Sequence, residues 1–300
     1  MDSIKTGSQF KFTLSCPSLQ LGEDVIYYSK HVEKKVECGK RQVESEAISY
    51  PEEGNEACFQ IEDHSFWFRH RNDCIRELVR NFPPKETGAI FDVGGGNGFV
   101  AKGLIDAGWD VVLVEPGQSG ARNAKKRGLE HVICATTHSA GFLNGSLPAI
   151  GVFDVVEHIE DDLGFLRHLW DLLEPGGLLY LTVPAYNFLW SHEDIDAGHF
   201  QRYTLGGMKK KLDSVGLAPV FGTYIFGFLP MLVFLFRTVP YKFGFVEQNK
   251  PEKIYSKDHV VQGGVSRLLL NNFLGIELRR IQKAKILPFG GSCMIAAKKK

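Results

Sequence analysis

The stretch Ile90-Phe-Asp-Val-Gly-Gly-Gly-Asn-Gly98 decides the fold predicted for this chain. A short apolar segment ends in an acid, Asp92, and is followed by glycines at every second position and by a helical run over 99–107. Glycine permits positive φ and leaves room where a side chain would collide with a ligand. The pattern therefore predicts a strand, a tight turn and a helix whose backbone contacts a nucleotide-like ligand.

A second acid, Glu115, ends the next predicted strand, about twenty residues after the glycines. A carboxylate there can accept hydrogen bonds from both hydroxyls of a ribose. A dinucleotide site would favour G-x-G-x-x-G, with a pyrophosphate at the helix N-terminus, whereas the spacing here is G-x-G-x-G. The carboxylate of Asp92 is instead suited to pair with the positive end of a ligand.

Strands and helices alternate along the middle of the chain. We predict strands at 89–92, 111–114, 131–135, 150–153 and 178–183, and helices at 66–82, 99–107, 121–127 and 163–173. Crossovers of this length require a parallel sheet that is covered by helices on both faces. Further along, we predict a helix at 205–215, a buried strand and helix within 224–236, a helix at 265–286 and a closing strand at 292–297.

The composition is that of an ordinary folded protein, with 44% hydrophobic and 23% charged residues. Lys plus Arg number 35, as do Asp plus Glu, so the chain has no global positive field to attract phosphates. We therefore expect no nucleic-acid partner. The start of the chain lacks an apolar run behind basic residues, which predicts a cytoplasmic location.

The cysteines are scattered along the chain and form no C-x-x-C pair. The six are Cys16, Cys38, Cys58, Cys74, Cys134 and Cys293. This spacing favours reduced thiols over a disulfide framework or a zinc site, so no metal is assigned.

These motifs, with Phe153-Asp-Val-Val-Glu-His158 and Leu173-Glu-Pro-Gly-Gly-Leu178, resemble the class I S-adenosylmethionine-dependent methyltransferases, especially the ubiquinone/menaquinone-biosynthesis-like branch. The resemblance spans about residues 64–216. It implies an α/β fold with a Rossmann-like, doubly wound, seven-stranded and mostly parallel sheet whose last strand is antiparallel. We expect an N-terminal appendage over 1–60, with turns at 51–55, and a methyltransferase domain over 61–300 that carries a helical insertion at about 229–288.

The resemblance also implies a set of residues around the cofactor S-adenosylmethionine. Asp92, Gly94, Gly96, Gly98 and Glu115 would line it, and Arg71 would meet its carboxylate. Family members often place an acid after the third strand to hold the adenine amino group, whereas this chain has Cys134-Ala-Thr-Thr137. A backbone group or the hydroxyl of Thr136 would replace that acid.

Asp154, Glu157 and His158 are spaced so that a helix beginning at the end of the fourth strand would turn all three to one side. One interpretation is structural, with Asp154 as a helix cap and Glu157 favouring the helix dipole. A second is a divalent metal site of oxygen and imidazole ligands. A third is direct contact of Asp154 or its neighbours with the cofactor or the substrate.

A polar loop over 184–204 follows the fifth strand and is too long for a simple connection, which predicts a lid over the acceptor. A histidine of this region, His192 or His199, or the earlier His158, could take the proton of an alcohol or phenol as the methyl arrives. The alternative is that His192 and His199 only order the loop through Asp194 and Arg202.

The aromatic-rich region 221–245 favours a small, apolar or lipid-linked acceptor, with a peripheral membrane contact as the alternative to burial of this segment. The predicted function is therefore transfer of a methyl group from S-adenosylmethionine to such an acceptor, with O-methylation favoured. The alternatives are a catalytically silent methyltransferase-like binding protein and a nicotinamide-dependent oxidoreductase, which the missing G-x-G-x-x-G disfavours.

Overall fold

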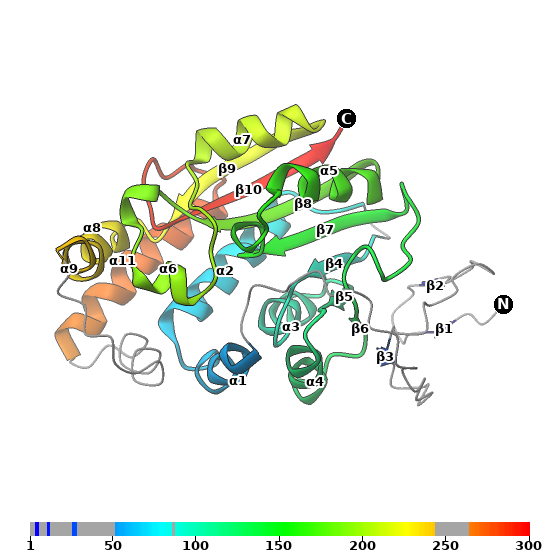
Figure 1. The fold of residues 1–300 in the computed structure, drawn as a ribbon, viewed down its shortest axis with the longest axis horizontal. Coiled ribbons are helices and arrows are strands. Elements are labelled where there is room, and N and C mark those ends of the chain that lie inside the picture. Colours follow the sequence, from blue (N-terminus) through cyan, green and yellow to red (C-terminus); the bar gives the residue numbers. More distant parts are fainter. Residues whose placement is uncertain (1–3, 6–10, 13–25, 29–51, 86–87, 244–263) are drawn as a thin grey trace.

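The computed structural model of the protein describes residues 4–5, 11–12, 26–28, 52–85, 88–243 and 264–300. A twisted sheet lies between two layers of helices (Figure 1). Its strand order is β3-β6-β5-β4-β7-β8-β10-β9. These strands are β3 (Ile26–Tyr28), β4 (Ile90–Val93), β5 (Val111–Val114), β6 (Val132–Cys134), β7 (Leu147–Phe153), β8 (Leu173–Pro184), β9 (Leu217–Ile225) and β10 (Ser292–Lys299).

The predicted seven-stranded sheet is confirmed in strands β4 to β10. Strands β4 to β8 pair in parallel, and the last strand, β10, runs antiparallel to both of its neighbours, β8 and β9. An eighth strand that the sequence analysis did not predict, β3, pairs antiparallel with β6 at the edge of the sheet. The short strands β1 (Ile4–Lys5) and β2 (Lys11–Phe12) form a separate pair.

Each face of the sheet has its own apolar core. The helices α5 (Asp162–Leu172) and α7 (Leu205–Ser214) cover one face, and α2 (Phe66–Asn81), α3 (Phe99–Asp106), α4 (Gln118–Lys126) and α11 (Gly264–Gln282) cover the other (Figure 1). Ser65 caps α2 by accepting a hydrogen bond from Trp67 N at 3.2 Å, and the helix ends before Pro83. The parallel strands thus end at one edge, where their acids meet the following turns.

Three of the differences from the sequence-based predictions have a local cause. The Pro-Gly-Gly segment predicted as a turn lies within β8, which begins at Leu173 and passes a bulge opposite Leu147–Ala149. Strand β9 begins at Leu217, ahead of the predicted segment, and the residues between Leu217 and Phe221 are only partly buried or exposed, so this part lacks a continuous apolar pattern. The predicted turn at 51–55 overlaps α1 (Glu52–Ile61), where acidic residues behind a proline form a helix N-terminus.

After β9 the chain forms a run of short helices: α8 (Leu229–Val233), the π-helix η3 (Phe234–Thr238) and α9 (Val239–Lys242). Burial predicted for this apolar segment holds for the strand but not for these helices, because Met231 is 67% exposed and Phe236 is 73% exposed. Among the residues that the structure describes, no helix is both long enough and apolar enough to cross a bilayer.

Candidate active site

The glycine turn after β4 adopts the backbone that the sequence predicts. Gly94 and Gly96 have φ of 67° and 51°, a region that other residues rarely enter. A Cβ on Gly95 would lie 2.2 Å from Leu113 Cδ1 and 2.6 Å from Asp92 Oδ2, so the turn has no room for a side chain there. Gly94 and Gly96 both line a large cavity, at the edge of the sheet where the parallel strands end.

Gly98 has a different role from the other two. Its φ is 73°, and it precedes the first residue of α3. A Cβ on Gly98 would lie 2.9 Å from Leu129 Cδ2 and 3.0 Å from Ala124 Cβ. Gly98 is not among the described residues that line the cavity. It is glycine because α3 and α4 pack closely, and the structure gives no direct contact with the cavity.

Glu115, at the end of β5, lies against the glycine turn. Its Oε2 accepts a hydrogen bond from Gly96 N at 2.8 Å, and its Oε1 accepts one from Gly117 N at 2.7 Å. Each carboxylate oxygen has a further lone pair that can accept from a hydroxyl. Burial raises the pKa of Glu115 to about 7, while the two backbone N–H groups act in the opposite direction. The glycine turn and Glu115, which the sequence analysis predicts to act together, are therefore connected by a direct hydrogen bond.

Asp92 is a fully buried carboxylate in the cavity wall. Neither oxygen has a hydrogen-bond partner among the described residues. Burial raises the pKa of Asp92 to about 7, with the Arg71 guanidinium acting in the opposite direction. An unpartnered buried acid is costly unless a ligand satisfies it. The site therefore fits a cationic ligand that also donates hydrogen bonds, as the ammonium group of S-adenosylmethionine does.

Arg71 and Asp154 form an ion pair in the wall of the cavity. The Arg71 guanidinium also lies over the ring of Trp67, with 4.8 Å to the centroid. Thr182 Oγ1 donates to Asp154 Oδ1 at 2.9 Å. Arg71 Nε has no partner among the described residues, so this side chain keeps a donor for an anionic group of the ligand.

The capping interpretation of Asp154 is wrong. Asp154 has φ of 58° and the chain forms only a short 3-10 helix, η1 (Val156–His158), after it. The cap of α5 is Asp161, whose side chain accepts from Gly164 N at 2.9 Å. The positive φ directs the Asp154 side chain toward Arg71, so its carboxylate belongs to the cavity wall.

Thr136 lines the cavity at the end of β6, as expected for the adenine end of the cofactor. Its hydroxyl lies 3.0 Å from Ser139 Oγ, and its backbone N–H donates to the same oxygen at 3.1 Å. The threonine therefore belongs to a local hydrogen-bonded turn. Its hydroxyl can still contact a ligand, because a hydroxyl group makes more than one hydrogen bond.

Two of the three predicted histidines meet in the cavity. The rings of His158 and His199 pack edge to face, with 4.8 Å between centroids. Burial, and then the neighbouring His199, lowers the pKa of His158 to about 4. His192 lies apart from them: it is partly exposed, its Nδ1 is 2.9 Å from Asp196 Oδ2, and it is not among the described residues that line the cavity.

Asp194 orders the lid loop around His199. This buried carboxylate lies 2.8 Å from His199 Nδ1 and accepts from Arg202 Nε at 2.7 Å and from Ser191 N at 2.9 Å. Hydrogen bonds to His199 and Arg202 keep the pKa of Asp194 low despite its burial. The proposed loop-ordering interaction thus exists for His199, and the same interaction holds its ring at the cavity wall.

Glu157 adds an acid beneath the two histidines. It is buried, its Oε2 has no partner among the described residues, and burial and the nearby Asp154 raise its pKa well above the usual range. One ligand-type atom from each of Glu157, His158 and His199 lies within 4.8 Å of the other two. The divalent-metal interpretation of this cluster therefore stays open, with His199 in place of Asp154.

The cavity, of about 1950 Å³, is lined by the glycine turn, by the two histidines and by a group of apolar residues that we call the apolar end. The apolar end is lined by Phe228, Leu229, Leu232, Phe236, Leu270 and Phe273. Arg237 of η3 donates to Glu193 of α6 (His192–Asp196) at 2.5 Å and connects this end to the lid loop. These residues come from segments far apart in the sequence, so periodicity alone could not place them together.

The N-terminal wall of the cavity also escaped the sequence analysis. Cys58 of α1 and Glu62 line the cavity, although residues 1–60 were interpreted as an appendage. Arg127, which caps the C-terminus of α4, holds this segment, because its guanidinium donates to Glu62 Oε2 at 2.6 Å and lies over the ring of Phe59, 4.8 Å from the centroid. The sequence pattern that could have predicted this helix is an acidic first turn followed by the apolar pair Cys58-Phe59.

A family profile described as a methyltransferase domain matches residues 66–220, more than half of the 300 residues. Curated relatives include the tRNA 5-carboxymethoxyuridine methyltransferase of Escherichia coli K12, 29% identical over 147 residues that cover 46% of this chain and 55% of the relative. The ubiquinone biosynthesis O-methyltransferase of Methylocella silvestris is 34% identical over 107 residues, which cover 33% of this chain and 41% of the relative. This chain thus spans about half the length, or less, of the curated relatives it matches.

Solved structures share the fold. Phosphoethanolamine N-methyltransferase 2 of Haemonchus contortus, solved with S-adenosylmethionine, has a TM-score of 0.52 at 17% identity, covering 84% of this chain and 58% of that one. A Haloferax volcanii methyltransferase, solved with the Trm112 methyltransferase activator, has a TM-score of 0.52 at 14% identity, and the match covers 82% of this chain and 93% of that one.

The expectation of no nucleic-acid partner is wrong, because a relative of this chain is a tRNA methyltransferase. The balanced net charge therefore did not justify that expectation. Net charge sums over the whole surface, whereas phosphate contacts depend on local charge. The prediction of a methyltransferase rather than an oxidoreductase is confirmed by the family match. The chain therefore belongs to the class I S-adenosylmethionine-dependent methyltransferases, with S-adenosylmethionine as its cofactor.

Proposed function

We propose that the chain transfers a methyl group from S-adenosylmethionine to an oxygen atom of an acceptor with an apolar body. The observation that carries this proposal is the continuity of the cavity, which joins the glycine turn and Glu115 to two histidines and an apolar end. A relative named as an O-methyltransferase supports oxygen as the acceptor atom. The apolar end supports an acceptor that buries hydrocarbon or aromatic surface.

In the proposed cofactor site, Glu115 accepts hydrogen bonds from the ribose hydroxyls, and Asp92 accepts from the ammonium group. Arg71 faces the carboxylate of the methionine part, and Gly94 and Gly96 keep side chains away from the ligand. When bound, the cofactor supplies a methyl group on a positively charged sulfur. An acceptor oxygen would form the new bond to that methyl carbon as the carbon–sulfur bond breaks, and the electron pair of the broken bond would stay on sulfur. The protein mainly positions the two groups in line.

His199 is the better placed of the two cavity histidines to take the acceptor proton. Asp194 lies at its Nδ1, 2.8 Å away, so the carboxylate orients the ring and stabilises the imidazolium ion that forms. His158, whose pKa is lowered to about 4, stays neutral at pH 7 and orients the acceptor hydroxyl by a hydrogen bond. His192 is outside the cavity wall and has no part in this mechanism.

Calorimetry with S-adenosylmethionine tests the cofactor half of the proposal. Wild-type protein should bind it, and Gly96→Arg should abolish binding by filling the turn, whereas Gly206→Arg, at an exposed and open position outside the described cavity lining, serves as a matched glycine control. Protection from unfolding by NAD but not by S-adenosylmethionine would revive the oxidoreductase alternative.

Labelled S-adenosylmethionine tests the acceptor half. The protein is incubated with organic-phase extract, aqueous extract and bulk tRNA, the last because a relative is a tRNA methyltransferase. We expect label in an organic-phase product as a base-stable methyl ether. Label in tRNA alone would contradict the apolar acceptor, and cofactor binding without transfer to any fraction would indicate a catalytically silent binding protein.

A further inference from the structure

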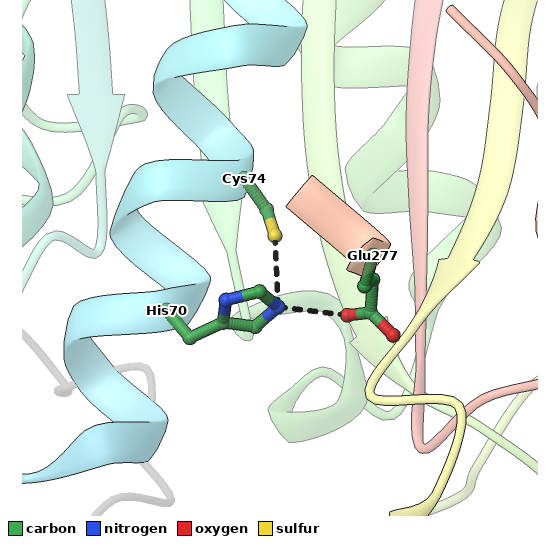
Figure 2. A group of neighbouring side chains, drawn as sticks. All are labelled: His70, Cys74 and Glu277. Carbon is green, nitrogen blue, oxygen red and sulfur yellow. Dashed lines mark hydrogen bonds and ion pairs between the residues drawn. The ribbon is translucent and has the colours of Figure 1, made fainter. Parts of the chain in front are cut away.

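Three buried side chains meet between α2 and α11, outside the residues that line the cavity (Figure 2). His70 and Cys74 lie one turn apart on α2, and Glu277 reaches them from α11. Their exposed fractions are 5%, 0% and 4%. His70 Nε2 lies 2.8 Å from Glu277 Oε1 and 3.4 Å from Cys74 Sγ, and the three ligand-type atoms all lie within 4.8 Å of one another.

Protons alone satisfy only one of the two contacts that His70 Nε2 makes. An imidazole nitrogen carries either a proton or a lone pair. If His70 Nε2 donates to Glu277, the Cys74 thiol finds no lone pair on that nitrogen. If Nε2 instead accepts from the thiol, its lone pair faces the carboxylate oxygen at 2.8 Å. One nitrogen therefore makes only one of its two contacts at full strength, and buried polar groups in this position are costly.

We propose that His70, Cys74 and Glu277 form a buried site for a zinc-type divalent cation. Imidazole nitrogen, thiolate sulfur and carboxylate oxygen are the ligands that zinc binds in proteins. Tetrahedral bonds of ordinary length would place nitrogen and sulfur about 3.5 Å apart and nitrogen and oxygen about 3.3 Å apart. The observed 3.4 Å matches the first, and the observed 2.8 Å requires a small outward shift of the Glu277 carboxylate.

The surroundings of Glu277 support this assignment. Its Oε1 also accepts from Phe226 N at 2.6 Å, and its Oε2 accepts from Gly227 N at 2.8 Å. Hydrogen bonds from outside the ligand set fix the orientation of metal-binding carboxylates in this way. The His70 ring packs edge to face against Phe226, with 5.3 Å between centroids. A cation here would neutralise the carboxylate and the thiolate inside an otherwise apolar contact.

The role of this cation is structural. It would tie α2 to α11 and to the turn at Phe226–Gly227, which leads directly to Phe228 and Leu229 in the apolar end of the cavity. It is separate from the cluster of Glu157, His158 and His199, which contains no sulfur ligand. A metal probe that reports on sulfur therefore distinguishes the two groups.

The test uses Co²⁺ and Zn²⁺ on the full-length, tag-free chain after treatment with a chelator. Co²⁺ should bind in a one-to-one ratio at this site and give a thiolate-to-cobalt charge-transfer band, which Zn²⁺ then removes. Zn²⁺ should also raise the Tm of the protein from which the chelator has removed metal. Cys74→Ser should lose the band, whereas the matched variants Cys58→Ser and Cys293→Ser should keep it.

The wild-type titration decides the proposal even where a variant fails to fold. A folded wild-type protein that shows no thiolate band with excess Co²⁺ would overturn the site. A band that persists in Cys74→Ser would also overturn it, because the metal would then be bound by other thiols. Neither readout depends on methyl transfer, so the outcome is independent of the proposed function.

Discussion

At the scale of single residues, the cavity contains acids that are buried without a fixed cation. Asp92 lacks any hydrogen-bond partner among the described residues, and Glu115 has only backbone N–H donors. In the proposed cofactor site, the ligand would complete this arrangement, since it would bring donors and positive charge to these two carboxylates. The proposed function would therefore explain why the chain has these acids at the ends of two buried strands.

A pH dependence of stability follows from Asp92. Burial raises its pKa from 3.8 to about 7, so between these values the folded state binds more protons than the unfolded state. Stability of the ligand-free protein should therefore fall as the pH rises through this window, by up to about 1.4 kcal/mol per pH unit for this group. Urea unfolding at pH 5 and pH 7 should show a smaller fall for Asp92→Asn. Equal slopes for the two proteins would contradict an ordinary acid buried at this position.

The histidine pair gives a second residue-scale prediction. His199→Asn should lower kcat by about 10²- to 10⁴-fold, the usual contribution of a general base, and leave the Kd for S-adenosylmethionine unchanged. His192→Asn is the matched control on the same loop and should keep wild-type kcat, because His192 pairs with Asp196 outside the cavity wall. Equal losses in both variants, with intact folding, would assign both histidines to loop order alone.

At the scale of elements, the glycine turn and the neighbouring strands could be predicted because local chemistry determines them. The apolar runs at Ile90 and Val111 are buried over their whole length, as parallel strands covered on both faces are. The 3-10 turn after Asp154 was not predictable, because its spacing fits a helix equally well and only the contact with Arg71 decides. The first residue of strand β8 could not be predicted either, because a Pro-Gly-Gly segment normally indicates a turn, whereas here a bulge accommodates it within the strand.

Helix α1 gives a prediction about an element that the sequence analysis did not identify. Arg127 is largely buried between Glu62, Asp63 and the Phe59 ring, and joins α1 to α4. Arg127→Ala leaves the buried Glu62 without its cation and should lower the free energy of unfolding by about 3 kcal/mol. Arg122→Ala, an exposed position on the same helix, should change it by less than about 0.5 kcal/mol.

Thermal unfolding and limited proteolysis measure the effect on α1. The Arg127→Ala variant should be cleaved faster near α1, and it should bind S-adenosylmethionine more weakly because Cys58 and Glu62 line the cavity. If the Arg127→Ala variant has the same stability and the same cleavage rate as wild-type protein, the ion pair contributes nothing and other contacts hold the helix.

At the scale of the whole molecule, the sequence predicted that the glycine turn and its neighbouring acids lie together, but not the shape of the cavity that they line. These acids and glycines are close in sequence and share one edge of the sheet, whereas the apolar end combines residues of α8, η3 and α11. No local pattern connects Leu229 with Leu270. The overall charge was similarly uninformative about partners, because it averages over every surface of the molecule.

The apolar end can be tested with two substitutions on one helix. Leu270 of α11 lines the cavity, whereas Leu268 on the same helix is 62% exposed and does not. Leu270→Trp should fill part of the apolar end and raise KM for the acceptor, leaving the Kd for S-adenosylmethionine near the wild-type value. Leu268→Trp adds the same side chain outside the cavity and should leave both constants unchanged. If neither KM changes, the acceptor does not extend past the histidines, and the apolar lining serves the packing of α8 and η3 instead.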